Sequence, residues 1–103
     1  MSAVSDSEIL SPGMMELPDI LDIKAAATLA EELLTLRGKA LEIDASRVQR
    51  LGGQCLQVLL SASMTWKADG NLFTLTRASS DFLEGLGRLG VSITEFNGRE
   101  RTQ

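Results

Sequence analysis

Hydrophobic and polar residues follow two different periods along the chain, and the periods alternate. In Asp22–Gly38, alanine and leucine recur at helical spacing, which predicts a helix with Asp22 as its N-cap and Gly38 as its C-cap. The short apolar segment Lys39–Asp44 predicts a buried strand. Asn71–Thr76 alternates with a period of two and predicts another strand. Strands that alternate with helices indicate an α/β fold.

A second helix is expected from about Gly53 to Ala68, ended by the turn residues Asp69 and Gly70. Its apolar positions exceed a one-sided stripe and occupy much of the circumference. These positions are Cys55, Leu56, Val58, Leu59, Leu60, Ala62 and Trp66. We expect Leu56, Leu59 and Leu60 to be core, which leaves apolar surface on the helix for a partner to cover.

A third helix is expected after Ser79 or Ser80, either of which can cap it, and it should end at Gly90. Its inner face is predicted to consist of Phe82, Leu83, Leu86 and Leu89. Gly85 and Gly87 each cost this helix about 1 kcal/mol relative to alanine. Close packing against a neighbouring element is one way to offset that cost.

Two further strands are expected at Met14–Pro18 and Val91–Phe96. The order strand–helix–strand–helix–strand–helix–strand predicts a small, mostly parallel sheet of about four strands, with helices packed on one side. We expect one domain over residues 14–97, a loose leader over 1–13 and a charged tail over 98–103.

The composition argues against several classes of function. The 103 residues carry a net charge of −4 at pH 7 and no histidine. An acidic chain without a basic stripe is a poor ligand for nucleic acid or for an anionic membrane. Without histidine there is no Ser-His or Cys-His nucleophile and no histidine metal site. We therefore expect a protein that is not an enzyme and binds no metal or cofactor.

The single cysteine excludes an intrachain disulfide and suits a reducing compartment. The amino-terminal segment has no basic start and no apolar core of signal-peptide length, and no apolar run approaches the length of a membrane helix. A cytoplasmic protein without a membrane-inserted segment is therefore expected.

The stretch LGGQCLQVLL, residues 51–60, lies downstream of a predicted strand and contains the entrance of the predicted second helix. Glycines at a helix entrance can direct N–H groups at a phosphate, but the spacing of the known nucleotide-binding motifs is absent. A tight turn of the backbone explains the two glycines better than a phosphate site does. Cys55 is a candidate nucleophile, yet no base stands near it in the pattern, and a small buried hydrophobe is the simpler interpretation.

Two other side chains have both a structural and a functional interpretation. Asp44, at the end of a buried strand, is expected to accept hydrogen bonds from loop N–H groups around Ser46. Trp66 is expected to pack at the end of its helix, and a binding hot spot is the alternative.

The stretch LEIDASRVQRLGGQCLQVLL resembles the central segment of STAS domains, the fold of anti-sigma-factor antagonists. An apolar strand, D-x-S-x-V and a leucine-rich helix follow in the family's order, and the resemblance extends over about residues 14–97. The family's phosphorylatable Ser or Thr is missing, however. Its loop positions are occupied here by Gly52, Gly53, Gln54 and Cys55. The resemblance therefore implies a STAS fold without the usual phosphorylation switch.

A narrower resemblance, to small STAS proteins of alphaproteobacterial chemotaxis clusters, implies a non-catalytic adaptor that binds the histidine kinase CheA and assists signal termination. The expected binding residues lie in the loop and on the exposed side of the second helix. They are Arg47, Arg50, Gly52, Gly53, Gln54, Cys55, Gln57 and Ser61. The alternatives are an anti-sigma-factor antagonist that lacks the switch residue, a STAS subunit of a lipid-transport ABC system, and an enzyme with Cys55 as nucleophile.

Overall fold

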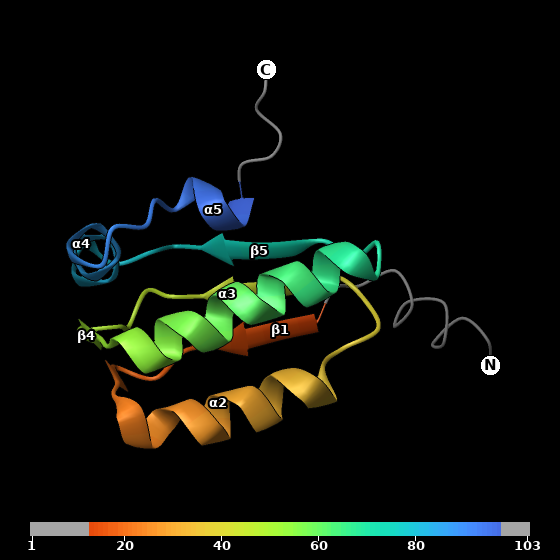
Figure 1. Ribbon diagram of the computed structural model, residues 1–103, viewed down its shortest axis with the longest axis horizontal. Helices are drawn as coiled ribbons and strands as arrows, with labels where there is room; N and C mark the ends of the chain where they lie inside the picture. Colours follow the sequence, from red (N-terminus) through yellow and green to blue (C-terminus); the bar gives the residue numbers. More distant parts are fainter. Residues whose placement is uncertain (1–12, 98–103) are drawn as a thin grey trace.

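Three parallel strands form the centre of the molecule, and two helices lie side by side over one face of them (Figure 1). The computed structural model describes residues 13–97. Along the chain its elements are β1 (Gly13–Glu16), β2 (Ile20–Leu21), α2 (Ile23–Thr35), β3 (Leu41–Asp44), β4 (Arg50–Leu51), α3 (Gly53–Ala68), β5 (Phe73–Thr76), α4 (Ser80–Arg88) and α5 (Thr94–Asn97). The central sheet has the order β1-β3-β5, so the predicted α/β class is confirmed.

The order of the strands explains the position of the helices. Each parallel step, from β1 to β3 and from β3 to β5, moves in the same direction across the sheet, so α2 and α3 cover the same face. Burial alternates along all three strands. Met15, Ile43 and Leu75 point into the core beneath the helices, whereas Met14 and Glu16 on β1 are exposed.

A second, two-stranded sheet aligns the beginnings of the two helices. Ile20 pairs with Arg50 and Leu21 with Leu51, in two segments where no strand was predicted. The Gly52 N–H then donates to the Leu21 carbonyl at 2.8 Å. The amino-terminal ends of α2 and α3 are thereby fixed beside each other.

The helix ends follow the expected capping chemistry in most places. The Ala25 N–H donates to the Asp22 side chain at 3.1 Å, and the Phe82 N–H donates to Ser79 Oγ at 3.0 Å, so both N-caps are confirmed. The α3 helix has the predicted bounds. The α2 helix ends earlier than expected, with Leu36 as the C-cap, and Gly38 supplies a left-handed turn at φ 110° further on.

The expected last strand, Val91–Phe96, is wrong. The chain forms α5 there instead, preceded by a turn in which the Thr94 N–H donates to Ser92 Oγ at 3.3 Å. Hydroxyl bonds of this kind favour turns over strands. Phe96 is buried against Phe73, with ring centroids 6.4 Å apart. The central sheet therefore has three strands in the described part of the chain.

The predicted inner face of α4 is half right. Phe82 and Leu86 are buried, but Leu83 and Leu89 are 44% and 42% exposed. The third buried position is Gly85, where an added Cβ would lie 3.0 Å from Leu51 Cβ. Close approach of α4 to β4 turns the helix toward this glycine and moves the two leucines outward.

The two α4 glycines form a matched pair for a stability test. Gly85→Ala should lower the free energy of unfolding by up to about 2 kcal/mol, since overpacking costs about 1–3 kcal/mol and helix propensity returns only about 1 kcal/mol. Gly87→Ala should raise it by up to about 1 kcal/mol, because nothing lies within 4 Å of the added Cβ. Urea unfolding of both variants measures the difference. Equal stabilisation by both would contradict the close contact.

Candidate functional site

The exposed ridge of α3 carries almost no charge. Lys67, near its end, is the only ionisable acid or base among the helix's 16 residues apart from the Cys55 thiol. Gln54, Gln57 and Ser61 are exposed along this ridge, and Met64, the next residue along it, is 71% exposed. A helix turned toward water usually carries charged residues on its outer side. The outer side of α3 instead offers amides, a hydroxyl and a thioether.

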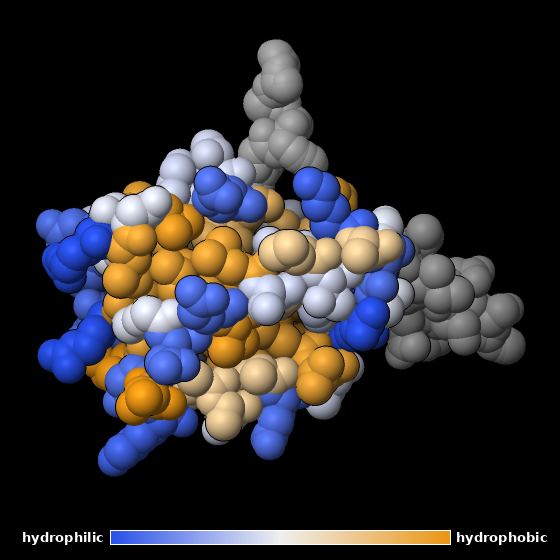
Figure 2. Space-filling model, viewed as in Figure 1, coloured by the Kyte–Doolittle hydropathy of each residue, from blue (hydrophilic) through white to orange (hydrophobic). Residues whose placement is uncertain are grey.

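This ridge borders a groove between α2 and α3, with a volume of about 380 Å³. We define the α2–α3 groove by its lining: Ala30, Leu33, Leu34, Gln54, Gln57, Val58, Ser61, Ala62, Thr65 and Trp66. None of these side chains is charged. Figure 2 shows the same face, on which hydrophobic side chains are exposed and hydrophilic ones lie among them and around the margin. Leu34 is the most exposed large apolar side chain of the lining, at 66%.

An ion pair joins the two helices beyond one end of the groove. Arg37 Nε lies 2.8 Å from one carboxylate oxygen of Asp69, and Nη2 lies 3.1 Å from the other. Arg37 follows the end of α2, and Asp69 is the C-cap of α3. Their bidentate contact lowers the pKa of Asp69. It helps to hold the two helix ends at a fixed separation.

Trp66 packs at the inner wall of the groove. Its indole Nε1 donates to the Lys39 carbonyl at 2.8 Å, and its ring meets Phe73 edge-on at 5.5 Å between centroids. Only 2% of the residue is exposed. The packing interpretation is confirmed, and the alternative of an exposed hot spot loses its basis.

The loop before α3 has the geometry of a tight turn. Gly52 is the N-cap of α3 and makes no side-chain cap bond, and a Cβ at this position would lie 3.2 Å from the Leu21 carbonyl oxygen. The structural interpretation of this glycine is thus supported. Arg50 and Gly53 are exposed at the same end of the molecule. They remain candidates for partner contact.

Cys55 requires a correction as a binding residue. Its side chain is fully buried, and its Sγ donates to the Asp22 carbonyl oxygen at 3.2 Å. Burial, and secondarily the charge of Asp22, raise the pKa of the thiol. A first-turn position would lower that pKa if the thiol were solvated, but desolvation outweighs this effect. Cys55 therefore offers no surface to a partner and is poorly placed as a nucleophile.

Asp44 has the structural role that was expected of it. The Ser46 N–H donates to Asp44 Oδ1 at 2.8 Å, and Arg77 Nε lies 3.6 Å from Oδ2. Hydrogen bonds from the Ser46 side chain and backbone are the main cause of a lowered Asp44 pKa, and the positive charge of Arg77 adds to them. The carboxylate thus ties the loop after β3 to the end of β5.

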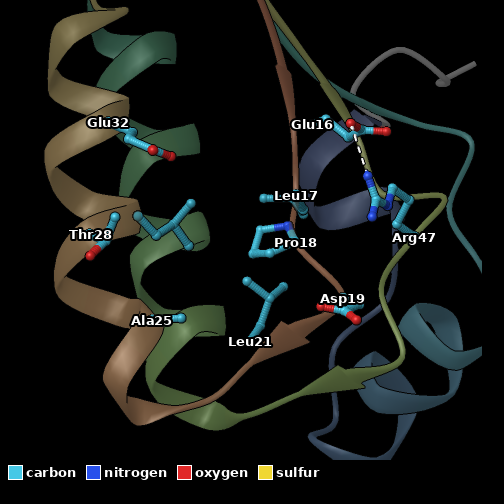
Figure 3. A pocket seen from close by; sticks show the side chains of 10 residues that line it. Glu16, Leu17, Pro18, Asp19, Leu21, Ala25, Thr28, Glu32 and Arg47 are labelled. Carbon is cyan, nitrogen blue, oxygen red and sulfur yellow. Dashed lines mark ion pairs between the residues drawn. The ribbon is translucent and has the colours of Figure 1, made fainter.

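Arg47 lies apart from the other predicted binding residues. It is 3.7 Å from the Glu16 carboxylate, at the edge of a second hollow of about 420 Å³ between β1 and α2 (Figure 3). Leu17, Pro18 and Leu21 form part of this hollow, and Thr28 and Glu32 face it from α2. The predicted set is therefore divided. Gln54, Gln57 and Ser61 share the α2–α3 groove, and Arg47 does not belong to it.

Sequence reasoning missed the contribution of α2 to the groove. Ala30 and Leu34 stand one turn apart and lie beside the buried stripe of Leu29 and Leu33. The sequence indicated this contribution only through Leu34, an additional leucine beside an apolar stripe that already suffices for the core. Leu34 could be assigned to a groove only once α3 was seen to lie beside α2.

The chain belongs to the STAS-domain family: a family model described as "Mlab, STAS domain" matches residues 6–93. No curated protein and no solved structure gives a significant match. Membership indicates an anti-sigma-factor-antagonist-like or related signalling and regulatory role. Domains of this family are generally non-catalytic.

Two features are absent from residues 13–97. In this range, no group of three or more His, Cys, Asp or Glu side chains is placed to hold a metal ion. Nor does the described range contain a helix with the length and hydropathy needed to cross a membrane.

The Cys55 geometry predicts slow thiol chemistry. At pH 8, a disulfide reagent should modify the folded protein at least about tenfold more slowly than the denatured protein, because the raised pKa keeps the thiol neutral and burial blocks access. Absorbance of the released thiolate gives both rates. Comparable rates in the folded and denatured states would contradict the buried position and revive a reactive cysteine.

Proposed function

We propose that this protein is a non-catalytic STAS adaptor that binds a signalling protein through the α2–α3 groove and the exposed ridge of α3. The observation that carries the proposal is the uncharged character of this face. An acidic protein gains solubility from charge on its surface, and neither packing nor capping requires Gln54, Gln57 and Ser61 to be neutral. A protein interface explains why these three residues are uncharged, because the cores of protein interfaces are depleted of charged residues.

The residues of this face suit protein recognition. Gln54 and Gln57 each offer a donor and an acceptor, and Ser61 offers a hydroxyl that can do both. They flank apolar wall formed by Leu34 and Val58. Apolar contact surrounded by hydrogen-bonding groups is the usual composition of a protein interface.

The partner is proposed from the resemblance to STAS proteins of chemotaxis clusters. We propose the histidine kinase CheA, with the adaptor assisting termination of the phosphoryl signal in the cytoplasm. The absence of a hydroxyl from residues 52–55 favours a constitutive adaptor over partner switching by phosphorylation. The burial of Cys55 and its hydrogen bond to the Asp22 carbonyl oxygen argue against this side chain as a nucleophile, which supports a non-catalytic role.

Calorimetric titration of CheA tests both the partner and the face. The unmodified protein should give saturable binding, and Gln54→Glu and Gln57→Glu should each weaken it about tenfold or more, since a new charge would be desolvated without a counterion. Both side chains are exposed, so the free energy of unfolding should change by less than about 0.5 kcal/mol.

The control is Leu72→Glu, which adds the same charge at a 70% exposed position outside the groove lining and should leave the affinity unchanged. Binding that both glutamate variants leave intact would place the interface elsewhere. Absence of binding would remove CheA as the partner, and a +80 Da product after incubation with ATP and a cognate anti-sigma kinase would favour the antagonist alternative.

A further inference from the structure

We propose that the α2–α3 groove and the α3 ridge also pair with a second copy of this chain, so that the free protein forms a weak two-fold dimer that masks its own binding face. The inference uses the face of the proposed function but requires no partner. It concerns what covers that face when the protein is alone.

Charge is the first argument for a second copy. In a two-fold interface each surface patch meets itself, so every charged residue near the axis faces its own copy. The chain has a net charge of −4, and such pairing penalises its charged surfaces. The groove lining is free of charge, as are the α3 ridge residues Gln54, Gln57, Ser61 and Met64. This face can therefore meet a copy of itself without like-charge repulsion at its centre.

Shape is the second argument. The face contains both a hollow and projecting apolar side chains beside it. The hollow has small walls in Ala30, Ser61 and Ala62, whereas Leu34 is 66% exposed and Met64 71% exposed. A face with both projection and recess can satisfy both when it is turned onto itself. Leu34 of one copy would then bury surface against the groove of the other.

The length of the helices sets the expected strength. The 16 residues of α3 span about 24 Å, and two adjacent helices are about 20 Å across. Such a face covers roughly 500 Å² on each copy, or about 1,000 Å² in total, which is at the low end for specific complexes. An interface of this area is typical of weak or transient association, so the dimer should form reversibly and only at high protein concentration. A partner that binds this face more tightly would displace it.

Sedimentation equilibrium of the full chain tests the proposal over about 10 µM to about 1 mM, the range expected for a small interface. The average mass should rise from monomer toward dimer. Leu34→Glu and Leu34→Lys should each weaken association at least about tenfold, because either charge would be buried without a counterion. The lysine variant separates this effect from net charge, since it makes the chain less acidic.

Leu72→Glu is the matched control, because Leu72 is 70% exposed and lies outside the groove lining. It should leave association unchanged, and circular dichroism should show all three variants folded. A monomer at every concentration would overturn the proposal. So would a dimer that both Leu34 variants leave intact, or one that Leu72→Glu weakens equally. A monomer would leave the proposed partner site standing, because calorimetry with the kinase tests that site separately.

Discussion

Parallel pairing of β1, β3 and β5 is the constraint on which the rest of the structure depends. Both β1 and β5 pair with β3 over four residues, and the two connections cross on the same face of the sheet. That arrangement brings α2 and α3 together although β3, β4 and their connecting loops separate the two helices in the sequence. The β2–β4 pair fixes one end of the two helices, and the Arg37–Asp69 ion pair joins them at the other. The groove is a consequence of this geometry.

Folding and binding make different demands on α3. Its inner side is filled by Leu56, Leu59 and Trp66, which satisfy the core. Its outer side could carry lysine and glutamate at no cost to packing, yet apart from Lys67 near the end it carries uncharged residues. This neutral side is the strongest indication of function in the molecule, because stability alone gives no reason for it.

The loop at the start of α3 helps to align the two helices but lacks the phosphorylation site that is usual in the family. Gly52 allows the backbone to approach Leu21 closely, which helps to align the two helices. The same stretch lacks the hydroxyl that STAS antagonists use to add a charge. Cys55 is turned inward against Asp22 and cannot replace it. Residues 52–55 therefore offer no hydroxyl that a kinase could phosphorylate.

The sequence by itself determined the elements whose signals are local. Period and capping chemistry were sufficient for the bounds of α3, for the Asp22 and Ser79 caps and for the buried strands, because each depends on contacts within a few residues. The family motif added the fold. The α/β class and the inward position of Leu56 and Leu59 followed from these signals.

Only the tertiary structure decided the features that depend on neighbours distant in sequence. The outward turn of Leu83 depends on the close approach of Gly85 to Leu51, and the packing of Phe96 on Phe73 adds to the local Ser92–Thr94 hydrogen bond in favouring α5 over a strand. Whether Cys55 faced a partner or the core depended on the position of Asp22. The groove also depends on residues that are distant in sequence. Its two walls lie on separate helices, and no local sequence pattern indicates which helices pack side by side.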